Sequence, residues 1–291
     1  MPTVRLIVRY DGTGLSGWQR QRGVRTVQEE LERAASQMAK EPIRIHGAGR
    51  TDAGVHALAQ VAAFHTNANI PMKGWLLGLT SLLPPEIAVR EAREAPDGYD
   101  PRRASGGKRY RYLILNDRIR DPLFRDRAWH VFDKLDLAMM RSTAQHFVGQ
   151  HDFRAFRAAD CERINTVRHL FRVDLAESFT GREGLLALEV EGTAFLKNMV
   201  RIITGTLVDV ARGRLAPELV PRLLTDGDRT QSGITAPPQG LYLDEVFVKP
   251  EHRLADDSLR LRPSYADAIL GVTSAPGSSE AVDDDSLDEG G

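Results

Sequence analysis

Residues 47–57 read Gly47-Ala48-Gly49-Arg50-Thr51-Asp52-Ala53-Gly54-Val55-His56-Ala57. Three glycines within eight residues predict a tight turn, because glycine adopts backbone conformations that other residues avoid. Strand-like residues come before the turn, at 43–45, and after it, at 60–64. We therefore expect a strand-turn-strand crest that presents Arg50 beside Asp52.

The pairing of Arg50 with Asp52 has two interpretations. An arginine favours the ionised form of a nearby aspartate, and a carboxylate held in place can attack carbon or remove a proton. Alternatively, the crest is a structural loop with an ordinary surface ion pair, which is the commoner case for an isolated glycine-rich turn. The spacing excludes a phosphate-binding loop and a dinucleotide fingerprint, because the lysine of the first and the close glycines of the second are missing.

The composition is that of a globular protein with one large domain or two smaller ones. The chain has 291 residues, of which 42% are hydrophobic and 27% are charged. No apolar run is long enough for a membrane helix, and the N-terminus reads as a first strand and not as a signal peptide. The single cysteine, Cys161, excludes an internal disulfide framework and a cysteine-based zinc site. We expect a cytoplasmic protein.

The charge is unevenly distributed along the chain. Residues 251–291 contain ten acidic side chains and three arginines, a net charge of −7, which leaves +6 for residues 1–250 against −1 overall. Acidic blocks are typical of tails without fixed structure, and we expect disorder at residues 273–291, which are rich in Ser, Gly, Asp and Glu. The mildly basic body is compatible with a phosphate-rich partner.

Hydrophobic periodicity predicts strands and helices in mixed order. Strands are expected at residues 3–10, 87–95, 108–115, 163–175, 185–192 and 240–248, and helices at 26–38, 72–83, 134–147, 194–212 and 215–225. Thr26 followed by Glu29 has the pattern of a helix capping box. This order predicts an α+β fold with two similar subdomains, residues 1–105 and 106–250, that share one sheet, followed by the acidic tail 251–291.

Three further segments have both a functional and a structural interpretation. The loop from Tyr10 to Gln21 suits contacts with phosphates and bases, or it is a surface loop with Trp18 in the core. Residues 108–112 alternate basic and aromatic side chains, as in RNA-binding sheets that stack bases, or they form an ordinary half-buried strand. Lys197 and Arg201, four residues apart on a predicted helix, either meet an anion such as Asp52 or a phosphate, or extend to solvent.

The eight histidines show no spacing typical of a metal site. We therefore expect an enzyme that uses no metal.

Together, these segments resemble the tRNA pseudouridine synthases of the family named for TruA. The matching segments share the family's order and spacing and run through most of residues 4–248. They are Tyr10-Asp11-Gly12-Thr13, Gly17-Trp18-Gln19, Thr26-Val27-Gln28, residues 49–57, Arg109-Tyr110-Arg111-Tyr112, His151-Asp152-Phe153, Phe195-Leu196, Met199-Val200-Arg201 and Gly240-Leu241-Tyr242-Leu243.

The resemblance implies an activity, a fold and an assembly. The family isomerises uridine to pseudouridine at positions 38, 39 and 40 in the anticodon stem-loop of tRNA, without a cofactor. Its fold has two similar subdomains around a continuous, mainly antiparallel sheet flanked by helices, with the active-site cleft between them. Its members are homodimers in which both subunits contact the tRNA at each cleft.

The resemblance also assigns roles to five residues of this chain. Asp52 matches the catalytic aspartate, and Tyr110 matches the tyrosine that stacks on the target uridine. Arg50 matches the residue linked to the aspartate and to holding the nucleotide flipped out, and Arg201 matches the basic residue that ion-pairs with the aspartate. Leu243 lies in the segment that lines the uracil pocket. Whether Asp52 attacks C1′ or removes a ribose 2′ proton to give a glycal stays open.

The chain departs from the family pattern in three places. Residues 99–102 read Tyr-Asp-Pro-Arg where the family often has Phe-His-Ala-Arg, residues 197–198 read Lys-Asn, and residues 154–156 read Arg-Ala-Phe. These departures leave the tRNA contacts around 99–103 and 154–157 open. The alternatives are a catalytically silent RNA-binding protein and a glycosidase-like hydrolase, but a hydrolase of that kind needs two carboxylates and the crest has only Asp52.

Overall fold

The computed structural model describes residues 2–254, so the acidic tail beyond Leu254, including residues 273–291, lies outside the described residues. Within them, a ten-stranded sheet has the order β4-β1-β3-β10-β5-β9-β8-β7, with β2 beside β3 and β6 beside β5. The strands are β1 (Thr3–Tyr10), β2 (His46–Gly47), β3 (His56–His65), β4 (Ile87–Ala95), β5 (Ser105–Asn116), β6 (Trp129–Val131), β7 (Gly149–Asp152), β8 (Val167–Ala176), β9 (Leu185–Gly192) and β10 (Leu241–Val248).

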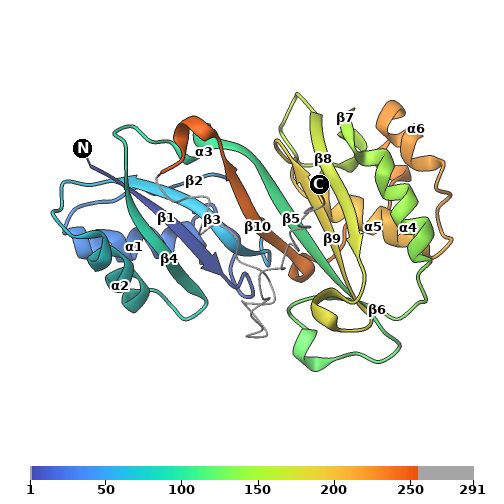
Figure 1. Cartoon of the computed structure of the whole chain (residues 1–291), viewed down its shortest axis with the longest axis horizontal. Coiled ribbons are helices and arrows are strands. Elements are labelled where there is room, and N and C mark those ends of the chain that lie inside the picture. Colours follow the sequence, from blue (N-terminus) through green and yellow to red (C-terminus); the bar gives the residue numbers. More distant parts are fainter. Residues whose placement is uncertain (1, 255–291) are drawn as a thin grey trace, which may run out of the picture.

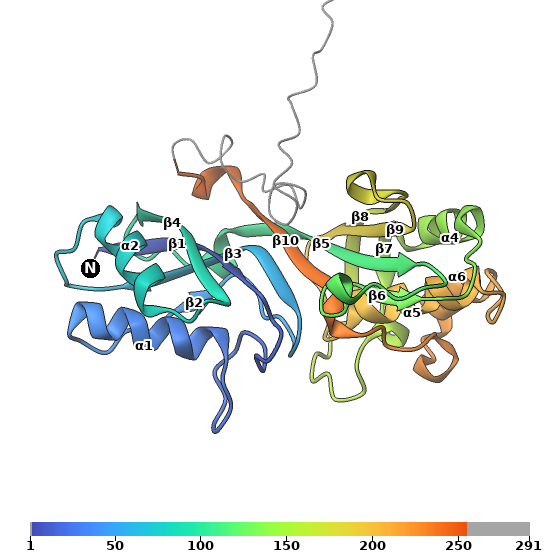
Figure 2. The same cartoon turned by 90° about the horizontal axis from the view of Figure 1, so that it is seen from below.

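The molecule is elongated, and its two halves lie side by side along the sheet (Figure 1). The N-terminal half carries α1 (Val27–Ala39) and α2 (Met72–Leu82), and the C-terminal half carries α4 (Leu137–Ala144), α5 (Met199–Ala211) and α6 (Leu219–Asp226). A single turn, α3 (Pro101–Ala104), leads into β5. Helices α1 and α5 lie on the same side of the sheet (Figure 2). In residues 2–254, no helix combines the length and the apolar character that crossing a membrane requires.

The predicted α+β class is confirmed, and most predicted elements form. Thr26 caps α1, and its hydroxyl accepts a hydrogen bond from the Glu29 amide at 3.4 Å. Along α1, Val27, Leu31, Ala34 and Ala35 are buried, which is the apolar face that the periodicity predicts. Burying one side chain of the size of leucine contributes roughly 1.5–3 kcal/mol to the free energy of unfolding.

Several element boundaries differ from the prediction, and the helices predicted from residues 134 and 215 begin at Leu137 and Leu219. The helix predicted from residue 194 begins at Met199, because Asn198 has a φ of +60°, a left-handed conformation that cannot continue as a right-handed helix. Lys197 therefore lies before α5 and does not share a helical face with Arg201. The strand predicted at 43–45 forms at His46–Gly47, and the strand predicted from residue 163 begins at Val167.

The last strand, β10, joins the two halves. It pairs in parallel with β3 and antiparallel with β5, so Leu243 lies opposite both Ala57 and Tyr110. The β3–β10 and β5–β6 pairs are parallel, and the other strand pairs are antiparallel. Strand β10 thus brings the Gly-rich crest next to β5, the strand that carries Tyr110. The predicted subdomain boundary at residues 105 and 106 falls at the start of β5 and stays a prediction.

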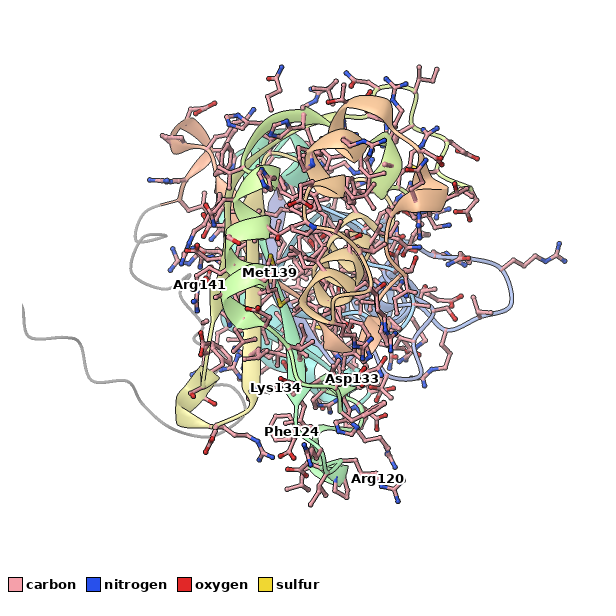
Figure 3. The ribbon with its side chains drawn as sticks, turned by 90° about the vertical axis from the view of Figure 1, so that its right-hand side faces the viewer. Arg120, Phe124, Asp133, Lys134, Met139 and Arg141 are labelled. Atoms are coloured by element: carbon pink, nitrogen blue, oxygen red, sulfur yellow. The ribbon has the colours of Figure 1, made fainter. Side chains whose placement is uncertain are left out.

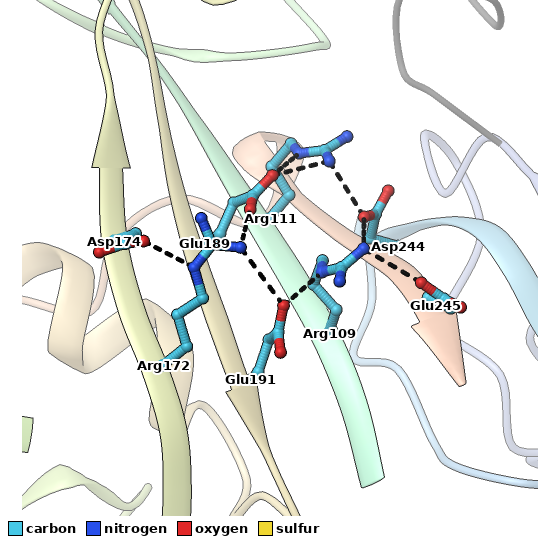
Figure 4. Close-up of polar contacts among 8 residues, drawn as sticks. All are labelled: Arg109, Arg111, Arg172, Asp174, Glu189, Glu191, Asp244 and Glu245. Carbon is cyan, nitrogen blue, oxygen red and sulfur yellow. Dashed lines mark hydrogen bonds and ion pairs between the residues drawn. The ribbon is translucent and has the colours of Figure 1, made fainter. Parts of the chain in front are cut away.

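The two faces of β5 have the contrasting character that its alternation predicts. Tyr110 and Tyr112 belong to the main hydrophobic core. On the other face, Arg109 and Arg111 enter an ionic network across four strands (Figure 4). The other members of the network are Arg172, Asp174, Glu189, Glu191, Asp244 and Glu245. Because its carboxylates come from β8, β9 and β10, the network fixes the position of β10 in the sheet.

Charged side chains lie on the outer face of the C-terminal half (Figure 3). Asp133 forms an ion pair with Arg212 at 2.9 Å, and Arg141 of α4 forms one with Glu177 at 2.6 Å. Phe124 is covered by the guanidinium of Arg182, 4.6 Å from its ring centre. This end contains none of the site residues predicted from the sequence.

Candidate active site

Asp52 lies at the crest of a turn between β2 and β3. The Val55 amide donates to the Asp52 carbonyl at 3.1 Å, and Gly54 closes the turn with a φ of +78°. The Gly54 amide also donates to the Leu15 carbonyl at 3.2 Å. A residue with a side chain is strained at that φ, and a Cβ atom on Gly54 would lie 2.9 Å from Pro238. Backbone geometry thus fixes Asp52, whose side chain remains 33% exposed.

The loop that follows β1 supports this turn from behind. The Trp18 amide donates to the Thr51 carbonyl at 3.1 Å, and the Tyr10 hydroxyl is hydrogen-bonded to the Thr51 hydroxyl at 2.8 Å. A Cβ atom on Gly12 would lie 2.2 Å from the Val55 carbonyl oxygen, so the two loops touch along their backbones. Trp18 is buried in the core. Of the two interpretations of this loop, the structure therefore supports the one with Trp18 inside.

The charge of Asp52 is balanced by groups at the start of α5. Burial raises the pKa of Asp52, whereas Arg201, Lys197 and the backbone N–H of Asn198 lower it. The Nη1 atom of Arg201 lies 4.0 Å from the Asp52 carboxylate, so the predicted ion pair is present at the limit of its range. The N-terminus of a helix also favours a negative charge. The carboxylate is therefore partly desolvated and held next to positive charge.

Arg201 is fixed independently of Asp52. Its Nε atom donates to the Ala236 carbonyl at 2.7 Å, and its Nη1 atom donates to the Asn198 side-chain oxygen at 2.8 Å. Burial lowers the pKa of Arg201, while Asp52 opposes that change. The guanidinium thus approaches Asp52 from a preset position, which suits a group that must hold a carboxylate in the ionised state.

Tyr110 lies on the same side of the sheet as Asp52, where the alternation of β5 predicts it. Its ring packs edge-on against Phe195, with centroids 4.9 Å apart, and it is 7% exposed. Burial raises the pKa of the Tyr110 phenol, and the charges of Tyr10 and Asp52 raise it further. The phenol is therefore protonated near neutral pH. Leu243 is the cross-strand partner of Tyr110 on β10 and is fully buried.

Arg50 is not placed as the crest pattern predicts. It is exposed, and within residues 2–254 its side chain makes no ion pair with Asp52. Its guanidinium instead lines a neighbouring pocket with Arg44 and Arg102. The expected Arg50–Asp52 pair is therefore wrong for this structure, because the turn directs the two side chains to different surroundings. The cation that Asp52 contacts comes from α5, far along the chain, and not from its own loop.

His56 is a site residue that the sequence reasoning missed. Its Nδ1 atom lies 3.1 Å from both the Gly12 amide nitrogen and an Asp11 carboxylate oxygen, and its Nε2 atom lies 3.1 Å from the Gln239 carbonyl oxygen. A neutral ring accepts from the Gly12 N–H, whereas a protonated ring donates to Asp11. Either form joins the end of the catalytic turn to the loop after β1 and to the segment before β10.

Asp11 extends this support to the C-terminal half. Both of its oxygens contact the guanidinium of Arg127, at 3.1 and 2.5 Å. Burial alone raises the pKa of Asp11, but hydrogen bonds from His56, Thr13 and Arg127 outweigh burial and hold that pKa well below its usual value. The sequence contains Asp11, Arg127 and His56 without any signal of their proximity, because more than 40 residues separate Asp11 from either partner.

Among residues 2–254, no group of three or more His, Cys, Asp or Glu side chains is arranged to hold a metal ion.

Known proteins resemble this chain along most of its length. The profile of a family described as tRNA pseudouridine synthase matches residues 6–102 and 143–247. The tRNA pseudouridine synthase A of Geotalea uraniireducens is 49% identical over 247 residues, which cover 85% of this chain and 100% of that protein. The Citrifermentans bemidjiense protein of the same name is 50% identical over 251 residues, covering 86% and 98%. That of Myxococcus xanthus is 46% identical over 249 residues, covering 86% and 93%.

Proposed function

Because the chain belongs to the tRNA pseudouridine synthase family, we propose that it isomerises uridine at positions 38, 39 and 40 of the tRNA anticodon stem-loop, with Asp52 as the nucleophile. The observation that carries this proposal is the position of Asp52. Its carboxylate is partly exposed at the crest of a rigid turn, at the N-terminus of α5 and 4.0 Å from Arg201. A reacting ribose can reach such a group, which stays fixed while it reacts.

The reaction rearranges bonds within one nucleotide. The N1–C1′ bond breaks, uracil turns, the C5–C1′ bond forms, and the proton on C5 is lost to a base while N1 gains one. The overall change is an isomerisation, so no electrons or groups are exchanged with a cofactor. An ionised Asp52 either attacks C1′ or removes the 2′ proton, and both routes require the carboxylate to be unprotonated. Arg201 and the Asn198 amide support that state against the effect of burial.

Tyr110 has a role as a stacking surface in this proposal. Because the pKa of its phenol is raised, the hydroxyl donates a hydrogen bond near neutral pH and does not act as a base in the free enzyme. Its ring and Phe195 provide an apolar surface next to Asp52, and aromatic rings of this kind hold unstacked bases. We propose that uracil stacks on Tyr110 while C1′ faces Asp52, with Leu243 lining the uracil pocket.

The target uridine must first leave its base stack, at a cost of roughly a few kcal/mol. Contacts between basic side chains and RNA phosphates offset this cost. Arg50 is an exposed guanidinium two residues before Asp52, and we propose that it holds the displaced nucleotide from outside. The alternative function, RNA binding without catalysis, would use the same contacts. It differs only in that Asp52 would not react with the bound nucleotide.

We further propose that the protein works in the cytoplasm as a homodimer whose two subunits both contact the tRNA. Sedimentation equilibrium tests the dimer directly, since a monomer of 32.3 kDa would contradict it. We also propose two subdomains, residues 1–105 and 106–250. Limited proteolysis checks that division, and cleavage first inside either subdomain, away from residues 105 and 106, would contradict it.

The test of the function is to incubate the protein with unmodified tRNA transcripts and to map pseudouridine in the product. We expect new pseudouridines confined to positions 38, 39 and 40. Modification elsewhere in the tRNA would contradict the positional assignment. Tight binding with no pseudouridine would favour the silent RNA-binding function, and release of free uracil would favour hydrolysis.

A further inference from the structure

A recess adjoins the catalytic turn at Arg50. It has a volume of about 460 Å³, and its lining includes Arg44, His46, Arg50 and Arg102, all exposed, together with Gln28 and Glu32. One wall is rigid, because a Cβ atom on Gly47 would lie 2.6 Å from the buried indole of Trp18. The recess is thus a preformed concave surface with several cationic groups and not a gap between mobile loops.

The amide and carboxylate groups of the recess already have partners. Gln28 accepts hydrogen bonds from Gln19 at 2.7 Å and from the Arg20 amide at 2.9 Å, and it donates to the Ile45 carbonyl at 2.9 Å. Glu32 accepts from the Ile45 amide at 3.1 Å and pairs with Arg20 at 3.3 Å. Glu32, the single carboxylate in the lining, is therefore neutralised by Arg20. It provides no counter-charge for the arginines of the recess.

The guanidiniums of the recess, in contrast, have no partner. In residues 2–254, the side chains of Arg44, Arg50 and Arg102 make no hydrogen bond and no ion pair. On the opposite face of the sheet, Arg109 and Arg111 are both paired with carboxylates. A planar guanidinium matches the oxygens of a phosphate and binds it through two parallel hydrogen bonds. The unpaired set therefore suits an anion that arrives with a ligand.

Lys108 adds a further cationic group, close enough to Arg102 of the recess for the two charges to interact. Its aliphatic stem covers Gly49, where a Cβ atom would lie 2.8 Å from the Lys108 Cε atom. The ammonium group donates to the Ser105 hydroxyl at 3.3 Å and has no carboxylate partner among the described residues. Burial, together with the nearby charge of Arg102, lowers the pKa of Lys108 to about 8. An anion in the recess would stabilise the charged form of this lysine.

We propose that this recess binds a backbone phosphate of the RNA strand beside the target uridine, through Arg44, Arg50 and Arg102, with Lys108 near Arg102. The inference rests on the proposed function for the placement of uracil on Tyr110. Lys108 and Tyr110 lie on one face of β5, two residues and therefore about 7 Å apart, which is close to the length of one nucleotide step. Arg50 stands two residues from Asp52 on the crest. A nucleotide stacked at Tyr110 thus leaves a neighbouring phosphate within reach of the recess.

The test is a double-mutant cycle between the protein and the RNA. Single neutral methylphosphonate linkages are placed in turn at each loop phosphate of an anticodon stem-loop RNA, and the Kd is measured by fluorescence anisotropy over a range of salt concentrations. At one position we expect the linkage to lower the slope of log Kd against log salt by about 0.7 for the wild type. For the variant Arg44→Gln/Arg102→Gln, we expect a similarly lowered slope with unmodified RNA. Adding the linkage then does not lower the slope of this variant further.

Arg222→Gln is the matched control, because Arg222 is exposed on α6 and has no partner among the described residues. It keeps the full response to the linkage. Thermal melting monitored by circular dichroism confirms that each variant is folded. Equal effects of the linkage on the wild type and on the double variant at every position would overturn the inference. Because only binding is measured, a protein that shows the coupling but forms no pseudouridine refutes the proposed function and not the phosphate site.

Discussion

The Nη1 atom of Arg201 lies 4.0 Å from the Oδ2 atom of Asp52. The two residues come from different halves of the chain and meet only because β10 joins the halves into one sheet. Burial raises the pKa of Asp52. The charge of Arg201 opposes this rise more strongly than any other group does. The pair therefore sets the fraction of enzyme whose carboxylate is ionised and able to react.

Replacing Arg201 with glutamine is expected to shift the acidic limb of the pH profile upward. The reaction needs ionised Asp52, and removing the opposing cation raises the pKa of Asp52 further. The rise of kcat/KM with pH then occurs at higher pH, and the rate at neutral pH falls by roughly 100-fold. Arg201→Lys restores part of the rate and of the profile. Single-turnover rates across a pH series provide the measurement, and an unchanged midpoint in Arg201→Gln would show that the cation does not control Asp52.

Gly12→Ala is expected to damage the turn through its support. The new Cβ atom would meet the Val55 carbonyl oxygen at 2.2 Å, and overpacking of this kind costs about 1–3 kcal/mol. We expect a lower Tm and a large loss of turnover, because the displaced backbone carries Asp52. Gly106→Ala is the matched control, since its Cβ would meet the flexible side chain of Lys249 at 3.2 Å and would lie at an ordinary contact distance of 3.6 Å from the Phe247 carbonyl oxygen. Equal stability and activity in the two variants would contradict the supporting role of the loop.

Asp11→Asn is expected to change how stability depends on acid. The folded-state pKa of Asp11 is held below its ordinary value of 3.8, so its contribution is present above that value and is lost as the pH falls below it. Between about pH 5 and about pH 3, the wild type therefore loses more stability than Asp11→Asn does. Urea unfolding at both pH values measures the difference. Parallel losses in the two proteins would mean that the contacts of Asp11 with His56 and Arg127 contribute no pH-dependent stability.

Asp244→Asn tests the ionic network behind the site. Asp244 and Arg111 have side chains that are 3% and 8% exposed, with 3.1 Å between their charged atoms. Removing one partner of a buried pair costs about 3–5 kcal/mol. Asp174→Asn removes a carboxylate that is 48% exposed and pairs with Arg172, and such surface pairs contribute about 0–1 kcal/mol. Urea unfolding compares the two variants, and similar losses would show that the network does not hold β10.

The sequence predicts the fold class and most elements because those depend on local patterns. The alternation at residues 108–112 places Tyr110 and Arg111 on opposite faces, and the Thr26–Glu29 pattern marks the start of α1, as the structure confirms. Helix α5 begins later than predicted, because the left-handed conformation of Asn198 depends on its tertiary surroundings and has no periodic signal.

The candidate site is less accessible to sequence reasoning, because its contacts join distant segments. Proximity along the chain suggested that Arg50 accompanies Asp52, whereas Arg201 does so in the structure. His56 stands within the most informative segment, yet its partners Gly12 and Gln239 are 44 and 183 residues away. The roles assigned to Tyr110, Arg50 and Leu243 through the family resemblance stay predictions until they are measured.

In the proposed mechanism, the carboxylate of Asp52 performs the chemistry. The most direct measurement is single-turnover pseudouridine formation on an anticodon stem-loop RNA, with the Kd measured in parallel, for the wild type, Asp52→Asn and the control Asp160→Asn. Asp160 is an exposed carboxylate that pairs with Lys197 at 2.6 Å. We predict no pseudouridine with Asp52→Asn, a Kd close to that of the wild type, and continued turnover with Asp160→Asn. Pseudouridine formation by Asp52→Asn at the wild-type rate would contradict the account.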